Sequence, residues 1–173
     1  PEPGNTLAIG PIARLGIADR DGLKAAMSLP PTARTVLVAL GGIASDLPLS
    51  NWPRIPDTTW LFAHAVHTGR DDMVNCSRLA TGFIDILASC DAVLTKPGYG
   101  TYAEAVCNAV PILTLARPDW PETAGMNNWA RQYGRLQEFS QAAFAGGDFA
   151  AALQTLWQQP VMAPPAPTGI AQA

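Results

Sequence analysis

Short apolar runs alternate with longer amphipathic segments along most of the chain. The apolar runs predict β-strands at residues 35–40, 60–63, 73–76, 92–95 and 111–115. Apolar positions at helical spacing predict helices at residues 22–28, 83–88, 103–110 and 123–136, with a last helix behind Asp148 as its N-cap. Strands that alternate with helices are typical of βαβ units around a parallel sheet. The pattern therefore predicts an α/β fold, a Rossmann-like parallel sheet of four or five strands flanked by helices.

The same pattern divides the chain into three parts. We expect residues 1–33 to form a linker and a short helix, and residues 34–160 to form the Rossmann-like domain. Residues 161–173 are rich in Pro and Ala and have no core-forming pattern, so we expect a mobile tail. The chain starts at Pro1 with an apolar run close behind, which favours a domain excised from a longer two-domain polypeptide. A processed or engineered terminus is the alternative.

The composition excludes several classes of protein. With 48% hydrophobic and 14% charged residues, the chain is too apolar for a disordered protein and too lightly charged for a coiled coil. The net charge is −3 and the 11 basic residues are scattered, which argues against a nucleic-acid partner. No apolar run approaches the roughly 18 residues of a transmembrane segment. Three widely spaced cysteines form no zinc motif, so we expect a reduced, cytoplasmic protein without metal or cofactor.

Two loops that follow predicted strands are candidates for ligand binding, because ligands of such sheets bind at the carboxyl ends of the strands. The first loop contains Gly41 and Gly42. Glycine lets backbone N–H groups approach a phosphate oxygen closely. The alternative is that the two glycines only turn the chain.

The second loop runs from Thr95 into a helix and contains Lys96, Gly98 and Gly100. A helix start offers unpaired N–H groups and a positive dipole end, which favours an anion, above all a phosphate. The loop is neither the dinucleotide fingerprint nor a Walker A motif, because the lysine precedes the glycines. Lys96 is either a phosphate partner or a solvated side chain.

Glu104 has two interpretations. Thr101 and Glu104 have the spacing of a capping box, in which the carboxylate returns to the N–H of the cap residue. Alternatively, the carboxylate accepts hydrogen bonds from the two adjacent hydroxyls of a ribose.

The stretch from Asp91 to Ala105, continued by Val110–Pro111–Ile112–Leu113, resembles the C-terminal domain of GT-B glycosyltransferases, which consist of two Rossmann-like halves. The segments 96–101 and 117–122 are more similar still to the glycosyltransferase-like region of L-arabinokinases and its bacterial relatives. The resemblance covers roughly residues 34–160.

This resemblance implies roles for the residues already singled out. The loop at Gly41 and Gly42 and the helix start at Gly100 and Thr101 hold a diphosphate, and Glu104 binds the ribose. Candidates for contacts with the donor sugar are Asp119, Glu122 and Asn127. The member of this family that acts in peptidoglycan synthesis has a glutamine–asparagine pattern in the corresponding segment, whereas Asp119 and Glu122 bring negative charge near the diphosphate. They either recognise sugar hydroxyls or mark a site that no longer binds a nucleotide sugar.

The resemblance therefore implies that the chain binds a nucleoside diphosphate sugar, with UDP favoured, as the donor half of a glycosyltransferase. The acceptor would lie on an N-terminal domain that this sequence lacks, and the catalytic residue is not assigned. The alternative is a non-catalytic module that senses a sugar or nucleotide for a linked enzyme domain, and an epimerase of the same architecture is a third option. His64 and His67 are either ordinary loop histidines or contacts of the nucleobase.

Overall fold

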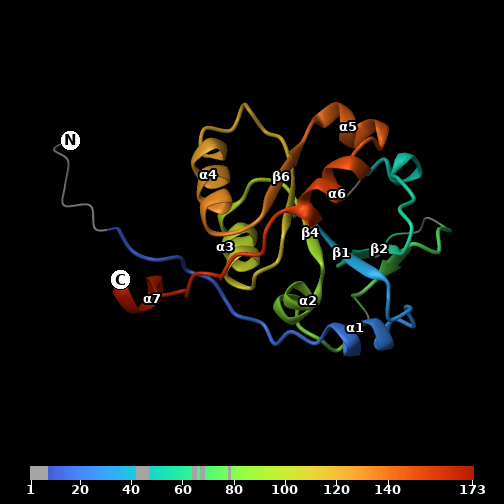
Figure 1. Ribbon diagram of the computed structural model, residues 1–173, viewed down its shortest axis with the longest axis horizontal. Helices are drawn as coiled ribbons and strands as arrows, with labels where there is room; N and C mark the ends of the chain where they lie inside the picture. Colours follow the sequence, from blue (N-terminus) through green and yellow to red (C-terminus); the bar gives the residue numbers. More distant parts are fainter. Residues whose placement is uncertain (1–7, 42–46, 64–65, 67–68, 78) are drawn as a thin grey trace.

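The computed structural model describes residues 8–41, 47–63, 66, 69–77 and 79–173. Its centre is one six-stranded sheet whose strands are all parallel, in the order β3-β2-β1-β4-β5-β6 (Figure 1). The strands are β1 (Arg34–Ala39), β2 (Thr58–Phe62), β3 (Met73–Asn75), β4 (Ala92–Thr95), β5 (Ile112–Leu115) and β6 (Leu136–Phe139). The predicted α/β class and Rossmann-like parallel sheet are therefore confirmed.

Helices cover both faces of the sheet. The helices are α1 (Arg20–Ala26), α2 (Phe83–Ser89), α3 (Tyr99–Cys107), α4 (Thr123–Tyr133), α5 (Gln141–Gly146), α6 (Ala150–Gln158) and α7 (Gly169–Gln172), together with a 3₁₀ turn, η1 (Leu49–Asn51). Alternate residues of β1 show how the faces are divided. Val36 and Val38 belong to the core under α6, whereas Leu37 belongs to the core under α1, α2, α3 and α4. Because both faces are buried, the strands read as continuous apolar runs.

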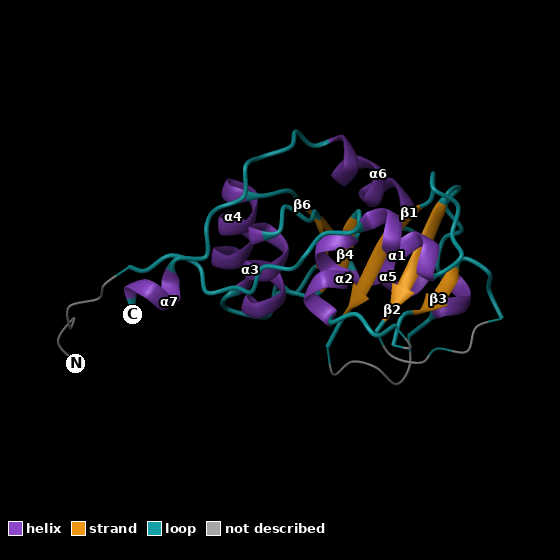
Figure 2. Cartoon of the chain, turned by 90° about the horizontal axis from the view of Figure 1, so that it is seen from below, coloured by secondary structure: helices purple, strands orange, loops and turns teal. Residues whose placement is uncertain are grey.

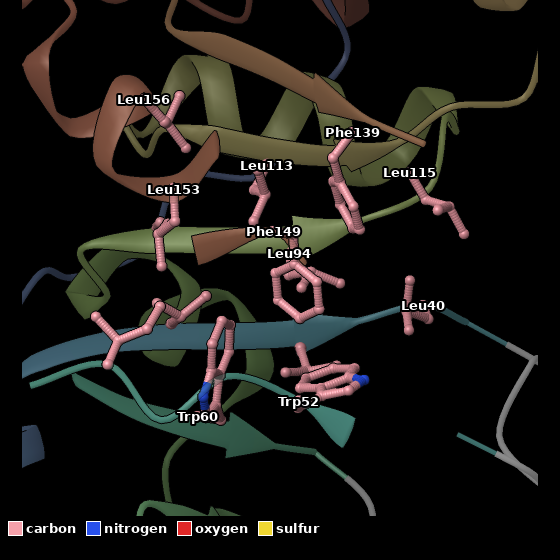
Figure 3. Close-up of a cluster of buried hydrophobic side chains, with 14 of the residues drawn as sticks. Leu40, Trp52, Trp60, Leu94, Leu113, Leu115, Phe139, Phe149, Leu153 and Leu156 are labelled. Atoms are coloured by element: carbon pink, nitrogen blue, oxygen red, sulfur yellow. The ribbon is translucent and has the colours of Figure 1, made fainter. Parts of the chain in front are cut away.

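The core under α6 is built around aromatic rings (Figure 3). The Trp52 ring lies edge-on to Trp60 and Phe149, at centroid distances of 5.3 and 5.4 Å. Leu153 and Leu156 complete this face from α6 and are fully buried. Aromatic pairs of this kind add about 0.5–1.5 kcal/mol each beyond the burial of their area.

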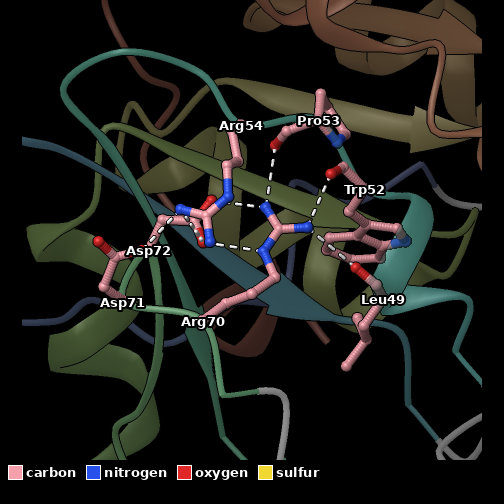
Figure 4. Close-up of polar contacts among 7 residues, drawn as sticks. All are labelled: Leu49, Trp52, Pro53, Arg54, Arg70, Asp71 and Asp72. Atoms are coloured by element: carbon pink, nitrogen blue, oxygen red, sulfur yellow. Dashed lines mark hydrogen bonds and ion pairs between the residues drawn. The ribbon is translucent and has the colours of Figure 1, made fainter.

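Arg70 holds the segment that carries Trp52 (Figure 4). Its Nη1 donates to the carbonyl oxygens of Leu49 and Trp52, at 3.0 and 2.7 Å. The same guanidinium forms a bidentate pair with Asp72, with Nε to Oδ1 at 2.9 Å and Nη2 to Oδ2 at 2.6 Å. This half-buried arginine satisfies carbonyls that have no strand partner and thereby fixes Trp52 in the core.

Between α4 and α6 the structure contains a strand and a helix that the sequence pattern did not predict. The helix predicted to reach residue 136 ends at Tyr133, and β6 and α5 follow it. Leu136 and Phe139 are the buried residues of β6, and their spacing of three positions also fits a helix. The N-cap of α6 is Phe149 instead of Asp148, since Asp148 N–H donates to Ala143 in the turn that ends α5.

Both terminal segments lie along the helices on one side of the domain (Figure 2). Residues 9–19 run extended past α3 and α2, where Gly16 N–H donates to Asn108 and Ile17 N–H donates to Asp85. The Pro/Ala-rich tail contains α7, which no sequence pattern predicted. Its Gly169 N–H donates to the Pro11 carbonyl at 3.1 Å. No helix among the described residues is both long and apolar enough to cross a membrane.

Candidate functional site at the switch point of the sheet

The strand order reverses between β1 and β4, because β2 and β3 lie on one side of this pair and β5 and β6 on the other. The last residues of the two strands, Ala39 and Thr95, are register partners. Thr95 Oγ1 donates to the Ala39 carbonyl at 2.8 Å and ties the strand ends together. The two glycine-containing loops thus leave the sheet side by side at its topological switch point, where doubly wound sheets bind ligands.

The contact between these loops joins Gly41 to Lys96. Gly41 has a φ of +64°, a left-handed conformation that favours glycine. A Cβ placed on Gly41 would lie 3.7 Å from Lys96 Cε and 3.8 Å from Nζ. The ammonium of Lys96 therefore lies over the backbone of the first loop. Gly42 lies outside the described residues.

The start of α3 lies directly behind Lys96. Gly98 is the N-cap, no side chain caps the helix, and its first turn has no acidic residue. A Cβ on Gly100 would meet nothing within 4 Å, so the first turn is open to the surroundings. Gly98 is extended, with a φ of −174°, and needs no glycine for its conformation. The first-turn N–H groups and the dipole of a nine-residue helix are therefore available to an anion.

The structure contains no capping box at Thr101, because the helix begins at Tyr99 and Thr101 lies inside it. The Glu104 side chain instead accepts a hydrogen bond from Arg14, with Nε to Oε1 at 2.6 Å. This ion pair raises the pKa of the Arg14 guanidinium. The Glu104 side chain is 12% exposed and that of Arg14 is 67% exposed. Arg14 was not predicted as a partner of Glu104. It lies in an extended segment without hydrophobic periodicity, so the sequence pattern does not indicate which helix the segment contacts.

The three candidates for sugar contacts lie in different environments. Asp119 and Glu122 are exposed on the way from β5 into α4, and Glu122 is the N-cap position of that helix. Since β5 neighbours β4, these carboxylates lie at the same edge of the sheet as Lys96. Asn127 is 2% exposed, and its Oδ1 accepts from the Tyr102 hydroxyl at 2.8 Å. Asn127 therefore belongs to a buried hydrogen-bond network around the Tyr102 hydroxyl.

Tyr102 is the centre of that network and was not singled out from the sequence. Its hydroxyl lies 2.7 Å from Thr114 Oγ1 as well as 2.8 Å from Asn127, and burial raises its pKa. These contacts join α3 to β5 and α4. The sequence pattern indicates only that Tyr102 is buried, because it lies one turn before Val106 on the apolar face of α3. Its role is to fix the helix whose start contributes to the site.

The described residues contain no group of three or more His, Cys, Asp or Glu side chains placed to hold a metal ion. Cys76, Cys90 and Cys107 are buried and unpaired. His64 and His67 lie outside the described residues, so the structure gives no position for the proposed base contacts.

No family model matches the sequence, and no curated protein matches it. Solved glycosyltransferases do share its fold over part of their length. The spinosyn forosaminyltransferase SpnP aligns with a TM-score of 0.62 and 16% identity, over 96% of this chain and 48% of that chain. The glycosyltransferase of kitacinnamycin aligns with a TM-score of 0.60 and 18% identity, over 90% and 41%. The spinosyn rhamnosyltransferase SpnG aligns with a TM-score of 0.60 and 15% identity, over 98% of this chain and 47% of that chain.

These identities are too low to show more than a fold. The chain spans 41–48% of the length of these three glycosyltransferases. SpnG has also been solved in complex with thymidine diphosphate. The chain has the Rossmann-like α/β fold of one domain half of a GT-B glycosyltransferase.

Proposed function

We propose that this chain binds a nucleoside diphosphate sugar and acts as the donor half of a glycosyltransferase. The observation that carries this proposal is the meeting of Gly41, Lys96 and the uncapped start of α3 at the switch point of the sheet. Backbone amides and one ammonium group converge there, and no acidic residue lies in the first helical turn. This donor set suits a diphosphate.

The nucleoside would lie further along α3. Glu104 is the carboxylate proposed to accept hydrogen bonds from the ribose hydroxyls, and its Oε1 is shared with Arg14 in the unliganded chain. The donor sugar would approach Asp119 and Glu122 at the start of α4, where carboxylates can accept hydrogen bonds from sugar hydroxyls. We favour uridine as the nucleoside, on the resemblance of residues 91–113 to the GT-B donor domain.

In sugar transfer, negative charge develops on the departing diphosphate. The Lys96 ammonium and the first-turn amides of α3 would stabilise that charge, and both are already in place before the ligand arrives. The acceptor and the group that removes its proton would belong to a second domain, so no residue of this chain is proposed as the catalytic base. We also propose a cytoplasmic location, because all three cysteines are free thiols.

Calorimetric titration with UDP, GDP, dTDP and ADP tests this function. We expect saturable binding with UDP tightest, and an affinity about tenfold lower in Glu104→Ala. Glu138→Ala is the matched control, because Glu138 also pairs with an arginine (Arg131) but lies on β6, two strands from β4. Absence of binding by the folded chain, or equal losses in the two variants, would contradict the proposal.

A further inference from the structure

A cavity of about 740 Å³ lies against α3 and α4, below the two terminal segments. Tyr99 and Tyr102 line it from α3, and Met126 and Trp129 line it from α4. The terminal segments contribute residues 9–11 and Pro165, Ala166 and Thr168. A volume of this size falls within the range of sites for small molecules, roughly 300–1,000 Å³.

The lining of this cavity selects the chemistry of its ligand. None of the lining side chains carries a charge. The phosphates of a nucleoside diphosphate would find no charged side-chain partner in this lining, which therefore favours an uncharged ligand. Trp129 and Tyr133 form an aromatic wall, with ring centroids 5.8 Å apart and planes tilted by 44°. Met126 adds a flexible thioether, which adapts to the shape of an apolar ligand.

The polar side-chain groups of the lining are four hydroxyls and one indole N–H, which belong to Tyr99, Tyr102, Tyr133, Thr168 and Trp129. The Tyr99 hydroxyl accepts a hydrogen bond from Ile12 N–H at 2.9 Å and keeps its own proton to donate. The hydroxyl of Tyr102 points into the core, toward Thr114 and Asn127, so this residue presents only its ring. A ligand that fits these groups is mostly apolar and has one or two hydrogen-bond acceptors.

Gly125 keeps the wall of the cavity open. It lies inside α4, where glycine destabilises a helix relative to alanine. A Cβ at this position would meet nothing within 4 Å, so no neighbouring side chain requires the glycine. Gly125 therefore weakens α4, and its lack of a side chain leaves room in the cavity.

The terminal segments are held over this space by specific bonds. Gly10 N–H donates to Gln172 Oε1 at 2.7 Å, and Gly169 N–H donates to the Pro11 carbonyl at 3.1 Å. The segments, which start and end the described chain, lie together beside α3 (Figures 1 and 2). Together with α3 and α4, the two terminal segments form the walls of the cavity.

We propose that this cavity binds an uncharged, ring-containing, mainly apolar small molecule, at a site that adjoins the diphosphate loops and shares Tyr99 of the first turn of α3 with them. The test uses the 173-residue chain and the neutral fluorescent probe N-phenyl-1-naphthylamine. We expect saturable enhancement of probe fluorescence. Gly125→Leu should weaken binding at least about tenfold by filling the cavity, and Gly125→Ala should weaken it about threefold. Ala151→Leu, which adds similar volume on the exposed face of α6, should leave the affinity unchanged.

Circular dichroism establishes that each variant is folded, and Gly125→Ala carries the test if the leucine variant unfolds. Probe binding that does not saturate, or that falls equally in Gly125→Leu and Ala151→Leu, would overturn the proposal. Displacement of the probe by UDP would overturn it as well, because the probe would then occupy the nucleotide site. Retained probe binding in the presence of saturating UDP is the supporting outcome.

Discussion

At the scale of single residues, Lys96 is the side chain whose placement distinguishes a phosphate site from a simple turn. Its ammonium lies beside Gly41 and is only half-buried, so it remains accessible to an anion. We predict that Lys96→Met weakens UDP binding about tenfold, which is the loss expected for one charge-assisted contact. Titration calorimetry measures this loss. Lys24→Met is the control, since Lys24 donates to the Pro31 carbonyl away from the site; an equal loss there would contradict the role of Lys96.

Arg14 competes for the carboxylate proposed to bind ribose. The Arg14 side chain is largely exposed, and solvent screens exposed ion pairs, so the competition is modest. We predict that Arg14→Ala raises the affinity for UDP, by up to about fivefold. Competition calorimetry against the unaltered chain measures the change. A lower affinity in Arg14→Ala would mean that the guanidinium binds the nucleotide itself.

The buried hydroxyl of Tyr102 shows why Asn127 could not be assigned from the sequence alone. The resemblance made Asn127 a candidate ligand contact, but Asn127 lies in the second turn of α4 and its partner is a tyrosine 25 residues earlier in the chain. We predict that Tyr102→Phe lowers the free energy of unfolding by about 1–3 kcal/mol, because Thr114 and Asn127 lose a buried partner. Urea denaturation measures the loss. Tyr133→Phe, at an exposed hydroxyl, should change stability by less than about 0.5 kcal/mol, and equal effects would contradict the network.

At the scale of elements, apolar runs bounded by polar residues were predictable as strands, including the edge strand β3, whereas the edge strand β6 was not. The bounds of β4 match the predicted strand, because a four-residue apolar and β-branched run that is soon followed by Pro97 and Gly98 has the length of a strand and is too short for a helix. β6 was missed, because Leu136 and Phe139 fit the period of the preceding helix as well as the edge of a sheet. The loops at the switch point were also predictable, since each follows a strand with a glycine. The pairing of Arg14 with Glu104 depends on a long-range contact that no local pattern contains.

The turn after α5 depends on Gly147. This residue has a φ of +82°, and a Cβ there would lie 1.7 Å from the Asn51 carbonyl oxygen. We predict that Gly147→Ala costs about 3 kcal/mol, from backbone strain and from the displacement of η1. Gly69 also has a positive φ, of +64°, but open space around it, so Gly69→Ala should cost only about 1 kcal/mol. Thermal and urea unfolding compare the two variants, and equal costs would contradict the close approach of α5 to η1.

At the scale of the whole molecule, buried thiols make the free energy of unfolding decrease as the pH becomes alkaline. Burial raises the pKa of Cys90 to about 12, and it also raises the pKa of Cys76. The unfolded thiols ionise above a pH of about 8.5, while the folded chain keeps them neutral. The stabilisation is therefore complete below about pH 8.5 and is lost as the pH rises toward 12.

We predict that Cys90 alone lowers the free energy of unfolding between pH 8 and pH 10 by about 1.4 kcal/mol for each pH unit above its unfolded pKa. Urea denaturation at the two pH values measures this slope. The Cys90→Ala variant should show a smaller slope, because it lacks the thiol that ionises on unfolding. A slope unaffected by this substitution would contradict the burial of Cys90 as the cause.

The arrangement of the whole domain explains why the site lies where it does. Parallel strands bring every strand-to-helix loop to one edge of the sheet, and the reversal between β1 and β4 opens a space there. The sequence pattern was sufficient to predict this edge, but not the packing of the terminal segments that form the second cavity. Those segments have no periodicity, and their positions depend on single hydrogen bonds to distant residues.

The most direct test of the central claim is the change in backbone amide NMR shifts of the ¹⁵N-labelled chain during a titration with UDP. We predict saturable shifts at Leu40 and Gly41 and at the start of α3 from Gly98 to Thr101, with little change in α5 and α6. That result would place the diphosphate at the switch point of the sheet. Saturable shifts confined to other parts of the domain, or none at all in the folded chain, would contradict the account.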